Sequence, residues 1–204
     1  MPYGTTVRYR MEMAQRRLSA DDWTAAALAA IADGGLAAVA VEPLAARLGA
    51  TKGSFYWHFT NRDTLIEATM QLWERACTDA IIDLVEAAGD PSEKLSLLFT
   101  TVLGHARSGR LEMNVLAVAE HPLVAPVVHR VTRRRLDYVE QLFAEAGFAP
   151  GEAGRRALLA YTAYVGQTQL AARLPELLPA GAGGRGAYLD SVLSVLLSPA
   201  RSVT

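Results

Sequence analysis

A short stretch, residues 48–59 with the sequence LGATKGSFYWHF, constrains this chain more than any other. Gly49 can adopt a positive φ without a Cβ clash, so it can end one helix and turn the chain into the next. Thr51 is a good N-cap for a following short helix, in which Phe55 and Phe59 lie four residues apart on one face. A helix, a glycine-containing turn and a second helix make a helix-turn-helix, whose second helix enters the major groove of DNA.

The second predicted helix carries hydrogen-bond donors away from its two phenylalanines. Lys52, Ser54, Tyr56 and His58 lie on other sides of the helix, because side chains at helical spacing divide between opposite faces. Residues 41–48 predict another short helix before the turn. A small helix that docks through two phenylalanines and presents donors on its open face is suited to reading DNA.

Further residues complete a longer pattern. They are the runs Val41-Glu42-Pro43-Leu44-Ala45, Leu48-Gly49, Thr51-Lys52-Gly53-Ser54-Phe55-Tyr56-Trp57-His58-Phe59 and Asn61-Arg62-Asp63 with Leu65. With them, residues 19–65 resemble the DNA-binding domain of the TetR/AcrR transcriptional regulators over roughly a quarter of the chain. Beyond Leu84 the resemblance is only an all-helical pattern. Ala40 is a departure, because such regulators often place a capping Thr or Ser there, but Glu42 and Pro43 still suit a helix start.

The resemblance implies roles for individual residues. In TetR-like regulators the positions that match Tyr56, His58 and Arg62 donate to DNA phosphates. Lys52 and Ser54 are the candidates for base contacts, which carry specificity, whereas phosphate contacts fix the register. The predicted DNA contacts are Arg47, Thr51, Lys52, Gly53, Ser54, Tyr56, Trp57, His58 and Arg62. For Trp57 core packing is an open alternative, and for Arg47 simple solvation.

Composition predicts an all-α protein of the cytoplasm. The chain has 204 residues, 51% of them hydrophobic, with many Ala and Leu and no alternating strand pattern. No apolar run approaches the ~18 residues of a membrane span, and the N-terminus lacks the apolar region of a secretory signal. A single cysteine, Cys77, excludes an internal disulfide and fits a reducing compartment. The net charge of −1 excludes a chain that is basic all over.

Breaks in the pattern predict three parts: residues 1–17, an N-terminal arm with four arginines; residues 18–64, a three-helix DNA-binding domain; and residues 65–204, a helical domain. The arm is either a tail without fixed structure or a basic segment that reaches into a minor groove. Helices are predicted over 19–34, 41–48, 51–59, 61–88, 91–108, 111–120, 123–146, 152–174 and 188–197. Residues 179–186, PAGAGGRG, predict a flexible loop.

The motifs of common enzymes are absent from the sequence. It has no His-Glu-x-x-His, Glu-x-x-His, Gly-x-Ser-x-Gly, Walker loop or dinucleotide fingerprint. His105, His121 and His129 lack metal-ligand spacing, and Cys77 has the apolar neighbours of an inert buried thiol. We therefore expect no enzyme, no cofactor and no metal. Arg130 and Arg133–Arg135 are interpreted as a solvated face.

By the resemblance, the helical domain binds an effector between its long first helix and the helices that follow. The candidate ligand contacts are Trp73, Cys77, Phe99, His105, Met113, Asn114, Leu116, Tyr138, Tyr164 and Gln167. Read singly, each of them is more often a core residue than a ligand contact, and the case for a pocket rests on their number. We expect a mostly apolar pocket of more than ~300 Å³ and a hydrophobic or aromatic effector of modest size.

A two-fold operator requires two recognition helices, so a homodimer is expected. The last two long helices carry apolar stripes that predict a four-helix seam across the two-fold axis. The stripe residues are Leu158, Tyr161, Thr162, Val165, Gln169, Leu189, Val192 and Leu196. The alternative is that both stripes pack into the chain's own core.

The predicted function is that of a ligand-responsive regulator that binds a near-palindromic operator in double-stranded DNA. The family resemblance favours a repressor that releases the operator when a small hydrophobic effector binds, although activators exist on the same plan. The alternative is a helical binding protein or enzyme that keeps the helix-turn-helix only as a scaffold. The donors gathered on residues 52–62 favour the regulator.

Overall fold

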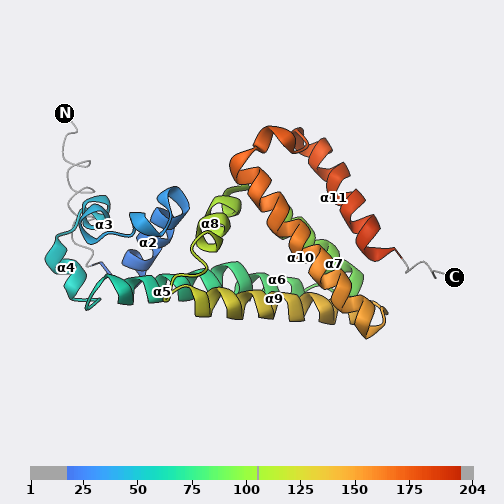
Figure 1. Cartoon of the computed structure of the whole chain (residues 1–204), viewed down its shortest axis with the longest axis horizontal. Helices are drawn as coiled ribbons and strands as arrows, with labels where there is room; N and C mark the ends of the chain where they lie inside the picture. The colour runs from blue at the N-terminus through green and yellow to red at the C-terminus, as the bar shows by residue number, and fades with distance from the viewer. Residues whose placement is uncertain (1–17, 105, 199–204) are drawn as a thin grey trace, which may run out of the picture.

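The computed structural model describes residues 18–104 and 106–198, and within them the regular structure is helical throughout (Figure 1). The α-helices are α2 (Ala20–Gly34), α3 (Val41–Leu48), α4 (Lys52–Tyr56), α5 (Arg62–Glu74), α6 (Ala80–Glu86), α7 (Pro91–Gly104), α8 (Ala106–Leu116), α9 (Ala125–Glu145), α10 (Pro150–Arg173) and α11 (Gly181–Leu197). Short 3-10 turns lie at η1 (Leu36–Ala38) and η3 (Pro175–Leu177). The all-α prediction is confirmed. The predicted arm, residues 1–17, lies outside the described residues.

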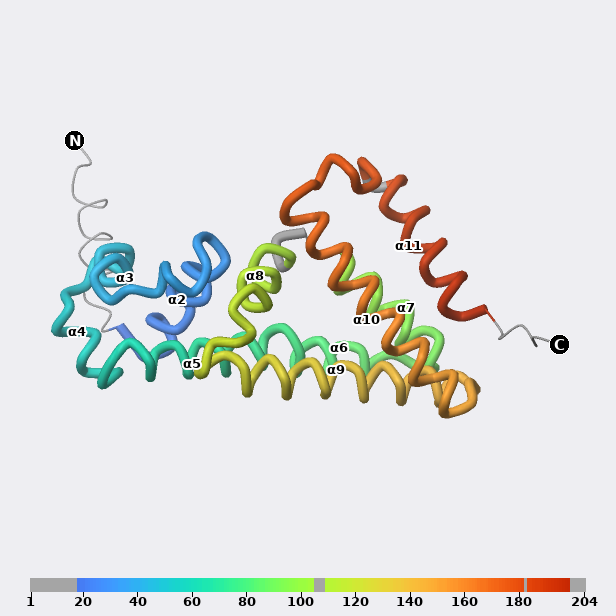
Figure 2. Tube along the Cα trace, viewed as in Figure 1, coloured from blue at the N-terminus to red at the C-terminus, as the bar shows by residue number. Residues whose placement is uncertain are grey.

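The molecule is elongated, with α2, α3 and α4 at one end and the remaining helices forming a body (Figure 2). The helix that begins at Arg62 and α9 run side by side along its length, while α10 crosses above α9 and packs on α8. In the described part of the chain, no helix has the length and apolar character of a membrane span.

The predicted helix starts are confirmed by their caps. The Ser19 hydroxyl accepts a hydrogen bond from the Asp22 amide at 3.2 Å, and the Asp22 carboxylate accepts one from the Ser19 amide at 2.8 Å. Thr51 caps α4 and Asn61 caps α5, because each side chain accepts from the amide three residues later. These bonds satisfy amides that the first turn of a helix leaves without partners.

The turn before α4 takes the predicted form. Gly49 ends α3 with φ 64° and ψ 29°, a left-handed conformation that costs a residue with a Cβ more than it costs glycine. Phe55 is fully buried on α4, with its ring 5.4 Å from that of Trp23 and 5.6 Å from that of Phe59. Three aromatic rings therefore hold the short helix against α2.

The core under α4 continues into the body. Its buried residues include Leu65, Ile66, Met70 and Trp73 of α5, and it is closed by five valines from the other helices and the segment before α9. The valines are Val115, Val124, Val127, Val128 and Val131. The domain boundary predicted between residues 64 and 65 stays a prediction. One buried apolar cluster contains residues from both sides of it.

The helix predicted over 61–88 is interrupted by a widened turn. Residues Arg75–Asp79, designated η2, form a π-helix between α5 and α6. Such insertions are rare and occur often at functional sites. This widened turn contains Thr78 and Cys77, whose hydroxyl and carbonyl oxygens accept hydrogen bonds from Arg135 of α9.

Two predicted boundaries are wrong. The break expected near residue 108 lies between α7, which ends at Gly104, and α8, which begins at Ala106. The loop expected over 179–186 is largely helical, because α11 begins at Gly181. Its later turns pack Leu189, Val192 and Leu196 into a second core, and that packing outweighs the cost of glycine in a helix.

Replacing Phe55 tests how firmly the core holds α4. Phe55→Ala is expected to lower the free energy of unfolding by about 3–5 kcal/mol, because a fully buried ring is lost and a cavity is left. Trp57→Ala, at a position that is 80% exposed, is the matched control and should change the free energy of unfolding by less than about 0.5 kcal/mol. Urea unfolding measures both, and equal losses would contradict the packing described.

Candidate functional site

The candidate nucleic-acid interface is the outward face of α4. Thr51, Lys52 and Gly53 are exposed, while Ser54 and His58 are half-buried. Tyr56 is 54% exposed and Trp57 is 80% exposed, which excludes core packing for Trp57. The face lies at the end of the molecule and is not covered by the rest of the described chain (Figure 1). Its residues are therefore free to meet a partner.

Two cations of this face are paired with carboxylates. Lys52 Nζ lies 2.6 Å from Glu42 Oε1, and Arg47 Nη1 lies 3.3 Å from Asp33 Oδ2. The hydrogen bond from Lys52 lowers the pKa of the Glu42 carboxyl, and the same bond raises the pKa of Lys52. Exposed pairs of this kind are weak, so a phosphate or base edge can replace the carboxylate.

Arg62 has a structural role that the sequence did not predict. Its Nε donates to the Val39 carbonyl at 2.6 Å and its Nη2 donates to the Leu36 carbonyl at 2.8 Å. Leu36 lies in the 3-10 turn η1 and Val39 directly follows it, so neither carbonyl belongs to a regular α-helix. Two of its donor groups therefore tie α5 to the segment between α2 and α3, and the phosphate contact of Arg62 stays a prediction.

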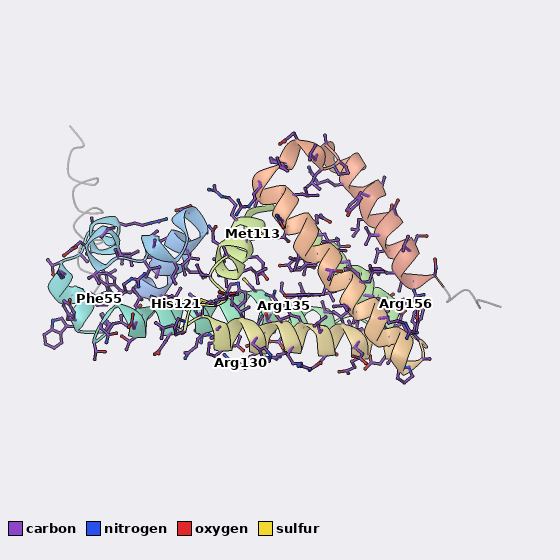
Figure 3. All side chains as sticks on the ribbon, in the orientation of Figure 1. Phe55, Met113, His121, Arg130, Arg135 and Arg156 are labelled. Atoms are coloured by element: carbon purple, nitrogen blue, oxygen red, sulfur yellow. The ribbon has the colours of Figure 1, made fainter. Side chains whose placement is uncertain are left out.

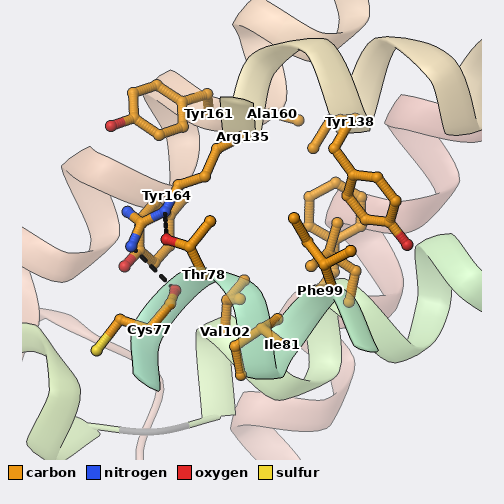
Figure 4. A pocket seen from close by; sticks show the side chains of 13 residues that line it. Cys77, Thr78, Ile81, Phe99, Val102, Arg135, Tyr138, Ala160, Tyr161 and Tyr164 are labelled. Carbon is orange, nitrogen blue, oxygen red and sulfur yellow. Dashed lines mark hydrogen bonds between the residues drawn. The ribbon is translucent and has the colours of Figure 1, made fainter. Parts of the chain in front are cut away.

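The body contains a cavity between the η2–α6 segment, α7, α9 and α10 (Figure 4). It is lined by Cys77, Thr78, Ile81, Ile82, Leu98, Phe99, Val102, Arg135, Tyr138, Val139, Ala160, Tyr161 and Tyr164. Its volume is about 70 Å³. A second hollow of about 250 Å³ shares Cys77, Ile81, Val102 and Tyr164 with it and extends to Ala76, Thr101 and Glu112.

The main cavity is smaller than expected. Its volume of about 70 Å³ falls below the ~300 Å³ typical of ligand pockets. The predicted pocket size is therefore wrong if this cavity is taken by itself. The reason is the bulk of four aromatic side chains that converge on it, Phe99, Tyr138, Tyr161 and Tyr164 (Figure 4). Only with the adjoining hollow does the space suit a small ligand.

Four of the candidate ligand contacts come together in the cavity wall: Cys77, Phe99, Tyr138 and Tyr164. Burial raises the pKa of the Cys77 thiol to about 11, so the sulfur is protonated at neutral pH. Burial also raises the pKa of Tyr138, whose hydroxyl donates to Glu86 Oε1 at 2.6 Å. Burial likewise raises the pKa of Tyr164, and these groups therefore bring no charge into the cavity at neutral pH.

The other candidates lie elsewhere, and their placement in the pocket is corrected. Asn114 Nδ2 donates to the Ile31 and Ala32 carbonyls near the end of α2, at 2.8 and 3.1 Å. Met113 and Asn114 border a separate polar hollow between α2, α8 and α10. The remaining four are Trp73, buried in the first core; Leu116, packed against that core; Gln167, whose Nε2 donates to the Leu103 carbonyl at 3.5 Å; and His105, outside the described residues.

Sequence reasoning missed Arg135, the cavity's charged residue. Its Nη1 donates to Glu112 Oε1 at 2.6 Å. Its Nε donates to Thr78 Oγ1 and its Nη2 to the Cys77 carbonyl, both at 3.0 Å (Figure 4). The guanidinium also lies over the Trp73 ring, 5.3 Å from its centroid.

The interpretation of these arginines as a solvated face is wrong for Arg135. A sequence signal was available, because position 135 lies four residues from Val131 and from Val139, which are both buried. Arg130 does lie at the surface (Figure 3), where it pairs with Glu74. Arg134 is half-exposed as well and pairs with Asp79.

The predicted dimer stripes divide between surface and core. On α10, Leu158, Thr162 and Gln169 are exposed and Val165 is half-buried. Tyr161 turns inward, its hydroxyl 3.1 Å from Thr132 Oγ1. On α11, Leu196 is buried in the second core, and Leu189 and Val192 pack against it. For these three residues the alternative of packing in the chain's own core describes the structure.

Comparison with known proteins supports the same reading of the first part of the chain. Residues 24–69 match the family described as bacterial regulatory proteins, tetR family. No curated protein matches the sequence. Among solved structures, a transcriptional regulator from Rhodococcus sp. Rha1 is 20% identical, with a TM-score of 0.70, over 88% of this chain and 94% of that one.

Two similar structures contain ligands. FadR from Bacillus subtilis, in complex with stearoyl-CoA, is 15% identical with a TM-score of 0.64 over 88% of this chain and 98% of that one. AibR, in complex with isovaleryl coenzyme A and operator DNA, is 18% identical with a TM-score of 0.64 over 89% and 99%. At these identities the likeness establishes the shared fold.

Replacing Arg62 separates its structural role from a phosphate contact. Arg62→Ala is expected to lower the free energy of unfolding by about 1.5–3 kcal/mol, because two carbonyls lose a charged donor. Arg75→Ala removes the same side chain from an exposed position of the same helical segment and is the control. An unchanged melting temperature for Arg62→Ala, together with weaker DNA binding, would contradict the structural role.

Proposed function

We propose that this chain, whose residues 24–69 match the TetR family of bacterial regulatory proteins, is a regulator of that family and represses transcription by holding an operator as a homodimer. A small, mostly apolar effector that enters the body releases the DNA. The family is not one of enzymes, and the body is its sensing part. The observation that carries the proposal is the uncovered, donor-rich face of α4 within the matched residues 24–69.

The DNA-reading part of the proposal rests on the two ends of α4. Its first turn carries the hydroxyls of Thr51 and Ser54 and the ammonium of Lys52 on exposed or half-buried residues, where they can donate to phosphate and base edges. Tyr56 and Trp57 present large rings that are 54% and 80% exposed. A helix-turn-helix kept only as a scaffold has no reason to leave a tryptophan 80% exposed, so the alternative function is disfavoured.

The effector part rests on the two connected hollows beside Cys77 and Tyr164. Their walls come from the η2–α6 segment and from α7, α8, α9 and α10, so a ligand there contacts most of the body. The solved relatives FadR and AibR carry acyl-CoA ligands, which supports a body that accepts an apolar group.

Helix α8 supplies the route from the cavity to the DNA-binding end. Glu112 faces the cavity, and Asn114, two residues later, holds the carbonyls near the end of α2. A ligand that shifts α8 therefore shifts α2 and the helices packed on it. The effector must bind the two arrangements with different affinity for this to release DNA.

The DNA contacts are tested by mutation of α4. A duplex selected by the protein from a random library should be nearly palindromic, with binding that weakens steeply as salt rises. Tyr56→Phe and His58→Ala should weaken binding to all sequences alike, as the loss of phosphate contacts does. Lys52→Ala should in addition relax base preference, by about 1–3 kcal/mol if Lys52 reads a guanine.

Gel shifts with the Lys52/Tyr56/His58 triple variant decide the matter. Lys94→Ala, which removes a cation from the body far along the chain, is the control and should bind normally. Binding by the triple variant that equals that of the unmodified chain would refute α4 as the reading helix.

The homodimer is tested by light scattering. A two-fold operator places recognition helices about 34–36 Å apart, or a multiple of this, which requires two chains. Because Leu158, Thr162 and Gln169 leave one face of α10 exposed, we expect the seam there, and Val165→Arg should split it. The variant should keep its helical circular dichroism but lose operator binding. A monomer mass for the unmodified chain would contradict the dimer.

A further inference from the structure

The ion pair between Arg135 and Glu112 is almost completely removed from solvent. The side chain of Arg135 is 13% exposed and that of Glu112 is 3% exposed, and the joined atoms lie 2.6 Å apart. Arg135 comes from α9 and Glu112 from α8, so the pair joins two helices across the interior. Burying two charges is costly unless each has a partner, and here each charge neutralises the other.

The pair lies where the two hollows meet. Arg135 lines the smaller, apolar chamber and Glu112 lines the larger one, while Cys77 and Tyr164 belong to both walls. A guanidinium has five N–H groups, and three of them donate to Glu112, Thr78 and the Cys77 carbonyl. Two N–H groups of Arg135 are therefore left over from these bonds.

The charge balance of this place limits what can bind. The cavity walls already hold one positive and one negative charge, and Cys77, Tyr138 and Tyr164 stay neutral at neutral pH because burial raises the pKa of each. A ligand carboxylate would leave one uncompensated negative charge in a space with little water, which is strongly unfavourable. A neutral acceptor meets no such penalty and satisfies a spare N–H.

We propose that the Arg135–Glu112 ion pair is the polar recognition point of the effector cavity and selects an uncharged ligand. That ligand is an apolar molecule with one hydrogen-bond acceptor of the ketone, ester or amide type, placed at Arg135. The inference rests on the proposed function, because it names the chemical class of the effector that the body receives.

A matched pair of probes tests the selection. 2-Octanone and heptanoate have the same six-carbon tail on a carbonyl carbon. The ketone carries a methyl group on that carbon, where heptanoate carries a charged oxygen. At about pH 8 heptanoate is fully ionised. The emission of Trp73 reports binding, because its ring lies 5.3 Å from the Arg135 guanidinium. The full chain carries Trp57→Phe to remove the exposed fluorophore. Trp23 remains, but it lines neither hollow, so the change in emission on binding is read from Trp73.

The ketone is expected to bind at least about tenfold more tightly than heptanoate. Glu112→Gln leaves Arg135 with an unneutralised charge, so in this variant the preference should reverse in favour of heptanoate. Glu74→Gln removes the same charge from the pair with Arg130, which also lies on α9 but joins it to α5 away from the cavity, and should leave the preference unchanged.

Each outcome decides the inference. A preference for the ketone that reverses in Glu112→Gln alone supports it. Equal or tighter binding of heptanoate by the unmodified chain overturns it but leaves the effector cavity in place. A preference that Glu112→Gln does not reverse also overturns it, because the ion pair then does not set the selection. If neither probe changes Trp73 emission, both the inference and the cavity part of the proposed function fail, while DNA binding stands.

A second variant keeps the test decisive if Glu112→Gln does not fold. Arg135→Leu/Glu112→Leu removes both charges together, so no buried charge is left without a partner. In this variant no arginine donates a hydrogen bond to the carbonyl oxygen of 2-octanone. The ketone should therefore bind about tenfold more weakly than it binds to the unmodified chain. Equal binding would overturn the inference.

Discussion

The DNA-binding end of this molecule depends on a hydrophobic core that it does not complete by itself. Trp23 and Phe55 meet at its centre, but the core is closed by Met70 and Trp73 of α5 and by valines around α8 and α9. A unit of 47 residues, the length of the predicted domain 18–64, buries too small a share of its apolar surface to be more than marginally stable alone. The reading helix is therefore held in place by the same helices that enclose the cavity.

Helix α8 couples the two ends of the molecule through short polar contacts. It contributes Val115 to the shared core, Glu112 to the buried ion pair and Asn114 to the carbonyls of α2. Because these three side chains lie within four residues, a small rotation of α8 affects all of them. Closely packed interiors transmit such a shift and do not absorb it. The widened turn at η2 places Thr78 and the Cys77 carbonyl on the other side of Arg135, so the pair is held from two directions.

The features that the sequence predicted correctly depend on local interactions. The caps at Ser19, Thr51 and Asn61 join residues only three positions apart, and Gly49 needs nothing but its own conformation. The pairing of Phe55 with Phe59 follows from helical spacing in the same way. The resemblance of residues 19–65 to a known family is local too, and the matched residues 24–69 confirm it.

The features that it missed depend on contacts between distant residues. Arg62 binds carbonyls 23 and 26 residues away, and Asn114 binds carbonyls 82 and 83 residues away. No periodicity reveals such partners. The sequence therefore predicted a DNA contact for Arg62 and an effector contact for Asn114. The interpretation of Arg135 as solvated was wrong for a different reason. Its position between Val131 and Val139 on the helix is a local pattern that indicates burial. The size of the cavity depends on how four aromatic rings pack, which the sequence pattern does not fix.

The central claim, that the DNA-binding end and the body form one cooperative unit, is tested most directly by native-state hydrogen exchange. The amides of Ile31 in α2 and Val131 in α9 both lie in helices packed on the shared core. If that core unites them, the two amides should exchange through the same opening, with equal free energies that fall together as urea is added. An Ile31 amide that exchanges through a separate opening of clearly lower free energy would show that the DNA-binding end unfolds independently, and would contradict the account.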